Sequence, residues 1–276
     1  MFNIPVGEVF ESIVNWLQMY ASGLFDVISL TIDFIVSYTQ QGLMVLPALL
    51  MIVLVAGIVY YLCGRGVAIF TLFGLLLIYS MGMWEETIQT LAMILTAGIV
   101  ALGIGIPVGI LSAKNEVVNN ILRSILDFMQ TMPPFVYLIP AVIFFGMGKV
   151  PGVIATVIFS MPPAIRLTDL GIRQVDEEVV EAANAFGSTP WQTLYKVQLP
   201  LAIPTIMAGV NQTIMLALSM VVIASMIGGG GLGSVVLRGI TQLEIGLGFE
   251  GGISVVILAI ILDRVTQSFN KIQKKV

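Results

Sequence analysis

The chain has 276 residues, of which 58% are hydrophobic and only 10% are charged, and its formal net charge is -4. About a quarter of the residues of a soluble domain are charged, because such a domain must cover its core with polar groups. The composition therefore excludes a soluble domain and indicates a membrane protein. The sequence also lacks histidine, the usual general base and the commonest metal ligand.

Residues 1–41 predict amphipathic helices that lie at the membrane interface. In the first stretch, apolar residues recur at three- and four-residue intervals with Glu8, Glu11 and Asn15 between them. The second stretch carries Asp26 and Asp33, and two acidic residues disfavour a position across the hydrocarbon core. A secretory signal peptide is not expected, because no basic residue comes before Arg65.

The rest of the chain predicts an all-α membrane protein with about seven spans. About twenty apolar residues cross the hydrocarbon core. We expect two accessory spans within residues 42–86 and five spans within residues 87–268, near 43–62, 66–83, 87–111, 132–147, 151–165, 201–227 and 251–268. The fourth and fifth are interrupted by Pro133, Pro134, Pro140, Pro162 and Pro163, either as packing kinks or as breaks beside a cavity.

Basic residues orient these spans. If the N-terminus lies outside, the inner loops receive ten of the twelve Lys and Arg residues, and only Lys149 and Arg238 fall outside. Cytoplasmic loops are enriched in such residues. We therefore expect residues 166–200 and the basic tail 269–276 in the cytoplasm, and residues 228–250 outside.

The cytoplasmic loop between the fifth and sixth spans predicts two short helices joined at a glycine. Asp176 is the expected N-cap of the first helix, and Gly187 is its expected left-handed C′ residue. Thr189 with Pro190 and Gln192 predicts a capping box with proline at N1, and Pro200 is expected to stop the second helix. We call residues 176–200 the knob.

A helix, a glycine turn and a second helix also describe a DNA-reading motif. Between Gln174 and Pro200, however, the only basic residue is Lys196 against four acids, and DNA binding requires several Lys and Arg side chains for the phosphates. This excludes nucleic acid as a partner. A protein partner fits better, because the small Ala182 and Ala183 permit close approach; a plain connecting loop is the other interpretation.

The knob resembles the EAA loop of permease subunits in binding-protein-dependent ABC importers. The match consists of Glu181-Ala182-Ala183, Gly187 and Val197-Gln198-Leu199-Pro200, with Val197 in place of the more usual isoleucine. The resemblance covers residues 87–268 and implies a type I importer core. It also implies that the loop couples to an ATPase subunit through Glu181, Ala182, Ala183, Gly187, Leu199 and Pro200.

The same resemblance implies the partners and the location. The family pairs two permease copies with two cytoplasmic ATPase subunits, which bind ATP and Mg, and with an extracellular solute-binding protein in the bacterial inner membrane. This chain is then not itself an enzyme. GMGKV (146–150) is no phosphate loop, because Ile143 stands where its first glycine belongs. GGGGLG (228–233) follows a membrane helix rather than a strand, so we expect a turn or gate element instead of a dinucleotide site.

The substrate is suggested by narrower similarity. LDFMQTMPPFVYLIP (126–140), residues 198–233 and ILDRVTQ (261–267) look like permeases for glycine betaine and related osmoprotectants, which implies a role in osmotic stress. Importers of methionine, phosphonate or sulfonate are the alternatives. A secondary transporter or a membrane-embedded enzyme is disfavoured, because no span has an ionisable residue at its centre. Candidates for the translocation path, or equally for helix packing, are Gln130, Thr131, Phe135, Tyr137 and Asn211.

Overall fold

The computed structural model of the chain describes residues 6–273, and every regular element in this range is helical. The predicted all-α fold is confirmed. The elements in chain order are α1 (Val6–Met44), α2 (Ala48–Cys63), α3 (Arg65–Ser80), α4 (Trp84–Lys114), α5 (Glu116–Thr131), the 3-10 turn η1 (Pro134–Tyr137), α6 (Leu138–Phe145), α7 (Lys149–Arg173), α8 (Glu177–Ala185), α9 (Pro190–Thr193), the π turn η2 (Leu194–Gln198), α10 (Leu199–Ala224), the 3-10 turn η3 (Ser225–Ile227), α11 (Gly231–Thr241) and α12 (Ile245–Gln273).

Five helical segments are long and apolar enough to cross a membrane, namely Glu11–Met44, Trp84–Lys114, Lys149–Arg173, Pro190–Ile227 and Ile245–Ser268. A sixth span is possible if α5 and the η1–α6 segment, which meet at an angle of 109°, count as one. The predicted accessory spans correspond to α2 and α3, each of 16 residues. At about 1.5 Å per residue, each is shorter than the hydrocarbon core is thick.

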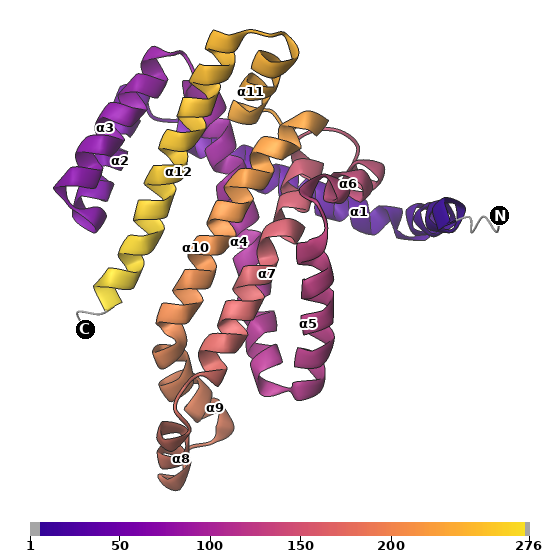
Figure 1. The fold of residues 1–276 in the computed structure, drawn as a ribbon, viewed down its shortest axis with the longest axis vertical. Coiled ribbons are helices and arrows are strands. Elements are labelled where there is room, and N and C mark those ends of the chain that lie inside the picture. The colour runs from indigo at the N-terminus through magenta and orange to yellow at the C-terminus, as the bar shows by residue number, and fades with distance from the viewer. Residues whose placement is uncertain (1–5, 274–276) are drawn as a thin grey trace.

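The centre of the fold is formed by α4, α7 and α10, which run side by side along the long axis (Figure 1). Glycines allow the close approach. A Cβ at Gly105 would lie 2.8 Å from the Cβ of Ala164, and one at Gly109 would lie 2.7 Å from the carbonyl oxygen of Ile165. On the other side of α7, a Cβ at Gly209 of α10 would lie 3.0 Å from that of Leu167. The backbones therefore pack as small residues permit in membrane bundles.

Prolines break the chain in one of the two predicted places. At Pro133 and Pro134 the chain bends sharply between α5 and α6, as expected. Of the two interpretations of Pro162 and Pro163, a break beside a cavity is wrong and a packing kink remains, because α7 continues through both as one helix of 25 residues. Both prolines are buried, and packing against neighbouring helices can sustain a helix whose backbone hydrogen bonds are locally lost.

Residues 116–131, which were not predicted as a span, form helix α5. Its side chains separate into a polar face and an apolar face, so a search for continuous apolar runs does not find it. Asn115 caps the helix by accepting hydrogen bonds from the backbone N–H groups of Val117 and Val118 at 2.9 and 3.2 Å. The α4–α5 connection is therefore a single extended residue.

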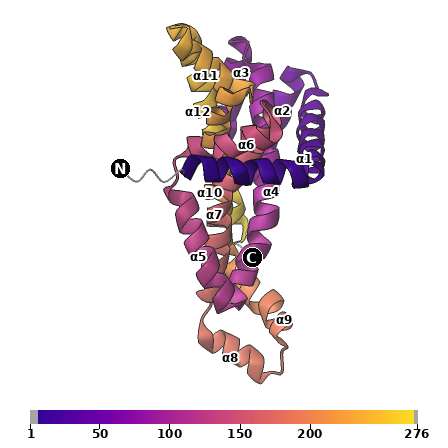
Figure 2. The same cartoon turned by 90° about the vertical axis from the view of Figure 1, so that its right-hand side faces the viewer.

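The two amphipathic stretches predicted at the N-terminus are one helix of 39 residues, α1. Figure 2 shows that the N-terminal part of this helix runs across the long helices. Phe25 stacks on Phe144 of α6 with ring centroids 4.6 Å apart, and the Gln18 amide donates to the Ile143 carbonyl at 2.8 Å. Glu11–Met44 passes the length and hydropathy test for a span, so the interfacial position of residues 1–41 stays a prediction.

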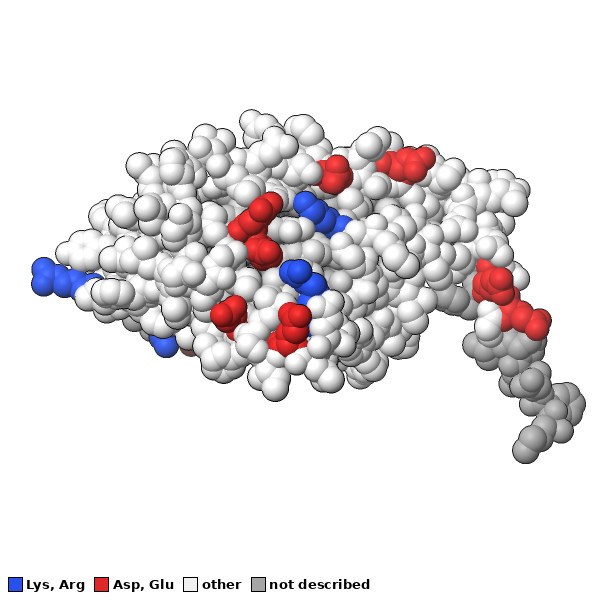
Figure 3. All heavy atoms as spheres, turned by 90° about the horizontal axis from the view of Figure 1, so that it is seen from above, with Lys and Arg blue, Asp and Glu red and all other residues white. Residues whose placement is uncertain are grey.

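The end that carries α11 is built on the glycine-rich turn. Residues Gly228 and Gly230 have φ of +87° and +78°, and the predicted turn is confirmed. The Leu232 N–H donates to Thr90 Oγ1 at 2.8 Å, which ties the turn to α4. Viewed from this end, the surface is mostly uncharged, with scattered acidic and basic groups (Figure 3). The predicted tail 269–276 lies beyond the described side chains.

Candidate functional site

The knob forms the tip of the molecule at the end opposite α11 (Figures 1 and 2). Its first helix, α8, begins as predicted at Asp176, whose carboxylate accepts the N–H of Glu178 at 3.0 Å. Gly187 follows its end with φ +82°. The N–H groups of Gly187 and Ser188 donate to the carbonyls of Asn184 and Ala183 at 2.9 and 3.2 Å, the two bonds of a Schellman motif. A left-handed glycine therefore sets the turn.

The second helix begins with the predicted capping box. The Gln192 N–H donates to Thr189 Oγ1 at 3.4 Å, and the Thr189 N–H donates to Gln192 Oε1 at 2.9 Å. The Thr193 hydroxyl then reaches back to Asn184 Oδ1 of α8 at 3.2 Å. Local hydrogen bonds thus fix the angle between the two short helices without a hydrophobic core.

Pro200 does not stop the second helix, contrary to prediction. The helical path continues from Pro190 to Ile227, with one π turn at Leu194–Gln198. Because Pro200 has no N–H and its ring would meet the carbonyl four residues earlier, the turn widens, and the Leu199 N–H donates to the Leu194 carbonyl instead. The Lys114 ammonium donates to Gln198 Oε1 at 2.7 Å. The knob is therefore joined to α10 through an unbroken helical rod.

The knob presents its side chains outward. No residue of α8 is buried, and Phe186 at its end is 93% exposed. Glu181 and Ala182 are exposed as well, whereas Ala183 is half-buried. A hollow of about 410 Å³ lies beneath α8, lined by Ala113, Ile172, Arg173, Val175, Glu177, Val180, Glu181 and Gln198. Such an exposed apolar tip is typical of a contact surface for another protein.

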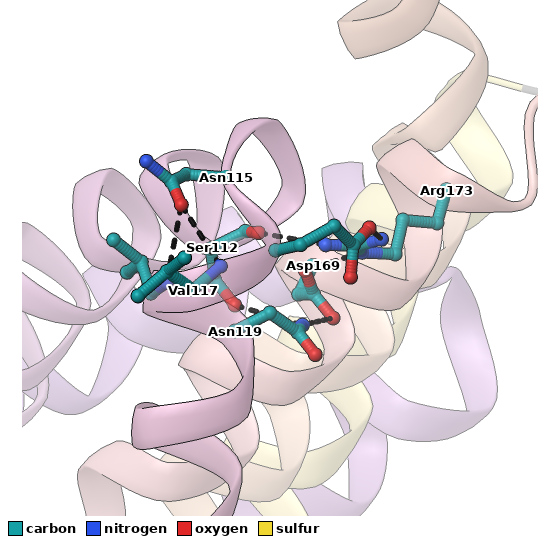
Figure 4. Close-up of polar contacts among 8 residues, drawn as sticks. Ser112, Asn115, Val117, Asn119, Asp169 and Arg173 are labelled. Atoms are coloured by element: carbon teal, nitrogen blue, oxygen red, sulfur yellow. Dashed lines mark hydrogen bonds and ion pairs between the residues drawn. The ribbon is translucent and has the colours of Figure 1, made fainter.

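A polar cluster joins the base of the knob to the helices above it. Arg173, the last residue of α7, donates to the Ser112 carbonyl at 2.8 Å and to Asp169 Oδ1 at 2.9 Å, and also contacts the carboxylate of Glu116. The Asn119 amide donates to Ser112 Oγ at 3.0 Å and to Asp169 Oδ2 at 2.9 Å. Figure 4 shows Asn119 and Arg173 converging on Asp169 from two helices. Sequence analysis did not identify this cluster.

The five predicted path residues do not share one surface. Gln130 and Thr131 end α5 and Phe135 follows the bend, and all three are exposed. The side chain of Tyr137 is buried and its hydroxyl donates to the Met129 carbonyl. Asn211 contacts α12, where its amide donates to Asp263 Oδ1 at 3.2 Å. Nothing in the single subunit tests contact with a solute, so all five stay predictions.

No described part of the chain gathers three His, Cys, Asp or Glu side chains in a metal-binding arrangement. The one thiol, Cys63, is half-buried and lies 3.3 Å from the Arg264 carbonyl oxygen.

Comparison with known proteins agrees with this geometry. Residues 105–275 match the family model described as "Binding-protein-dependent transport system inner membrane component". The chain is 50% identical over 272 residues to the glycine betaine transport system permease protein OpuAB of Bacillus subtilis, covering 99% of this chain and 96% of that protein. It is 52% identical over 272 residues to the glycine betaine/carnitine transport permease protein GbuB of Listeria monocytogenes, covering 97% and 96%.

Among solved structures, a chain of the MetNI methionine ABC transporter in an inward-facing conformation has a similar fold, with a TM-score of 0.63. The similarity covers 69% of this chain and 95% of that chain at 20% sequence identity. Identity at this level bears on the fold alone. It supports the predicted type I importer core.

Proposed function

The chain belongs to the family of binding-protein-dependent transport system inner membrane components, and from this premise we propose that the knob transmits the work of separate ATPase subunits to the membrane helices. The chain is a permease subunit of an ABC importer. In this proposal ATP and Mg are bound by the partner subunits, and Glu181, Ala182, Ala183, Gly187, Leu199 and Pro200 belong to the coupling surface.

One observation carries this proposal: helix α8 of the knob has no buried side chain, yet its shape is sharply specified. No α8 side chain is buried, so the fold of this chain does not require its sequence. Nevertheless, an N-cap, a Schellman turn and a capping box fix its shape. A defined shape without internal packing fits a surface that is shaped for a partner.

Two copies of the chain are expected to enclose the translocation path. Closed twofold symmetry is the commonest arrangement for identical subunits, and the family is expected to pair two permeases with two ATPase subunits and an extracellular binding protein. In the bacterial inner membrane, the knob would face the cytoplasm, with the N-terminus and α11 outside. Native mass measurement of the solubilised complex should show two copies of this chain; one copy in a transport-competent complex contradicts the proposal.

We propose glycine betaine, or a related quaternary ammonium osmoprotectant, as the solute. The names of OpuAB and GbuB assign glycine betaine to both relatives, and carnitine to one of them. Both solutes combine a methylated ammonium with a carboxylate and have no net charge. The likeness to the methionine transporter supports only the fold, so methionine remains the alternative solute.

The test is uptake by the complex in lipid vesicles. The complete complex with its ATPase subunits and binding protein should accumulate labelled glycine betaine when ATP is supplied to the knob side. An excess of unlabelled carnitine should compete, whereas methionine should not. Uptake of methionine without uptake of glycine betaine would overturn the substrate assignment and leave the importer assignment intact.

A further inference from the structure

Helix α5 turns its polar face toward α7, and of that face only Asn119 is buried. Glu116, Asn119, Arg123 and Asp127 recur at three- and four-residue intervals and therefore share one face. The opposite face, formed by Val117, Ile121, Ile125 and Phe128, is exposed. In a soluble protein these faces would be reversed. The polar face of α5 is thus directed at the rest of the chain, and specifically at α7.

Three polar rungs connect this face to α7. Glu116 contacts Arg173, the Asn119 amide donates to Asp169 Oδ2 at 2.9 Å, and Asp127 forms an ion pair with Arg166. Along the three pairs the residue numbers on α5 rise while those of their partners on α7 fall, as expected for antiparallel helices. We call these six residues the seam. Its three carboxylates outnumber its two guanidinium groups, so the seam carries a formal charge of -1.

Little else fixes α5 to the subunit. Its only buried side chains are those of Asn119 and Leu126, and a cavity of about 200 Å³ lies between α5 and α7, lined in part by Leu122, Leu126 and Ile165. An apolar contact can slide, whereas hydrogen bonds and ion pairs are directional. The seam therefore determines the register of α5 against α7.

The seam lies next to the knob in the chain. Arg173 is the last residue of α7 and stands three positions before Asp176, the N-cap of α8. Its guanidinium also holds the Ser112 carbonyl at 2.8 Å, at the end of α4. At its other end, α5 reaches Gln130, Thr131 and the 109° bend. The base of α7 is thus connected to α5 through side chains, because no backbone joins the two directly.

We propose that the seam is the linkage that transmits knob movement to α5, so that α5 and the base of α7 move as one body. Asn119, Asp169 and Arg173 are then positioning residues for transport, with the ion pair Arg166–Asp127 as the outer rung. This inference rests on the proposed importer function and extends it from the knob into the membrane helices.

The test is a charge exchange at the outer rung, because Arg166 and Asp127 form their only ion pair with each other among the described residues. The purified complex in vesicles is assayed for ATP hydrolysis and for glycine betaine uptake. We expect Arg166→Asp and Asp127→Arg, each alone, to lower the number of molecules taken up per ATP by about tenfold, within the range usual for coupled sites. The double variant should recover most of the loss.

Arg123→Gln is the matched control. Arg123 lies on the same face of α5 and lines the same cavity, but forms no ion pair within the described part of the chain. We expect its ratio of uptake to hydrolysis to remain unchanged. If the seam only stabilised the fold, the single variants would lower the melting temperature and reduce hydrolysis and uptake in parallel, with the ratio constant. That result, or a double variant no better than the singles, overturns the linkage.

A second measurement does not depend on removing a rung. In a Cys63→Ala background, Leu122→Cys on α5 and Ile165→Cys on α7 place two thiols on the walls of the cavity, and a short thiol-reactive bridge can join them. If α5 and α7 move as one body, the bridged complex should retain at least about half of its uptake, since a loss of this size corresponds to well under the 1.4 kcal/mol of a tenfold change. Abolished uptake in the bridged complex contradicts the proposal. An unmodified complex that fails to import betaine would instead refute the proposed function.

Discussion

The centre of the bundle and the knob are ordered by different means. Between α4 and α7, glycines bring backbones so close that an added Cβ at Gly109 would lie 2.6 Å from the Thr168 Cβ. In the knob, by contrast, a Cβ at Gly187 would meet nothing within 4 Å. Packing fixes the bundle, whereas caps and turns fix the knob. The two regions should therefore respond differently to the same kind of substitution.

Because of this difference, substitutions that lower the folding stability of the subunit can be told apart from substitutions that impair its coupling to a partner. Loss of packing in the bundle costs folding free energy, because close-packed interiors do not absorb added volume. Loss of the knob's shape removes little buried surface, so the subunit should remain folded. A change in the knob should instead affect only the coupling between the membrane helices and the ATPase subunits. The predictions below use this contrast, from the largest expected effect to the smallest.

The largest expected effect is on thiol labelling from outside the cell, which should be complete for a cysteine on one side of the membrane and absent for one on the other. In a Cys63→Ala background, exposed Ala185 of the knob or exposed Gln242 beyond α11 is replaced by cysteine. An impermeant thiol reagent applied to intact cells should label Gln242→Cys and leave Ala185→Cys unlabelled until the membrane is opened, because basic residues favour the inside. The opposite pattern would invert the topology and place the knob out of reach of ATPase subunits.

Gly187→Val should abolish uptake without unfolding the protein. A β-branched residue is a strong outlier at φ +82°, so the Schellman turn should open and α8 should point elsewhere. Gly187→Asn is the control, since asparagine tolerates the left-handed region best after glycine. Uptake in cells and thermal unfolding in detergent would be measured for both variants. Equal uptake by Val and Asn variants would show that the turn is not required.

Gly109→Ala should destabilise the bundle by about 1–3 kcal/mol, the usual cost of overpacking. A methyl group there would meet the Ile165 carbonyl oxygen at 2.7 Å, and backbone cannot yield as a flexible side chain does. Gly103→Ala on the same helix meets nothing within 4 Å and should be neutral or stabilising by up to about 1 kcal/mol. Unfolding measured in detergent distinguishes them, and similar stabilities would contradict the close approach of α4 and α7.

Glu181→Gln should have the smallest effect. Glu181 is exposed on α8, and one surface charge contact contributes about 0–1 kcal/mol. The affinity of the purified permease for its ATPase subunits should therefore fall by less than about tenfold, the factor that corresponds to 1.4 kcal/mol. A loss of assembly would mean that Glu181 makes a buried contact in the complex.

The sequence alone predicted best what local chemistry determines. Asp176, Gly187 and Thr189 set the ends of the knob helices through contacts within a few residues, and all three occupy the predicted positions. The family followed from the same short motif. Apolar runs also indicated the helices of the bundle, because length and hydropathy are properties of a segment by itself.

Features that depend on contacts between distant parts of the chain were not predicted correctly from the sequence. Pro162 and Pro163 do not break α7 because its neighbours sustain it, and Pro200 is absorbed by a π turn. Helix α5 lacks an apolar run, although the spacing of Glu116, Asn119, Arg123 and Asp127 could have indicated it. The partners of that face on α7 lie about 40 to 60 residues away, and no local pattern pairs them.

The central claim is that the knob transmits work instead of stabilising the subunit, and Ala183→Trp tests it most directly. The complete complex is reconstituted in vesicles, and ATP hydrolysis and glycine betaine uptake are measured with and without loaded binding protein. Because Ala183 is partly exposed on α8, which has no buried residue, an indole there should push a partner away. We expect unchanged melting of the permease and unchanged solute capture by the binding protein, with loss of both stimulated hydrolysis and uptake. Hydrolysis and accumulation at the unmodified rate would show that the knob is only a connector and would contradict the account.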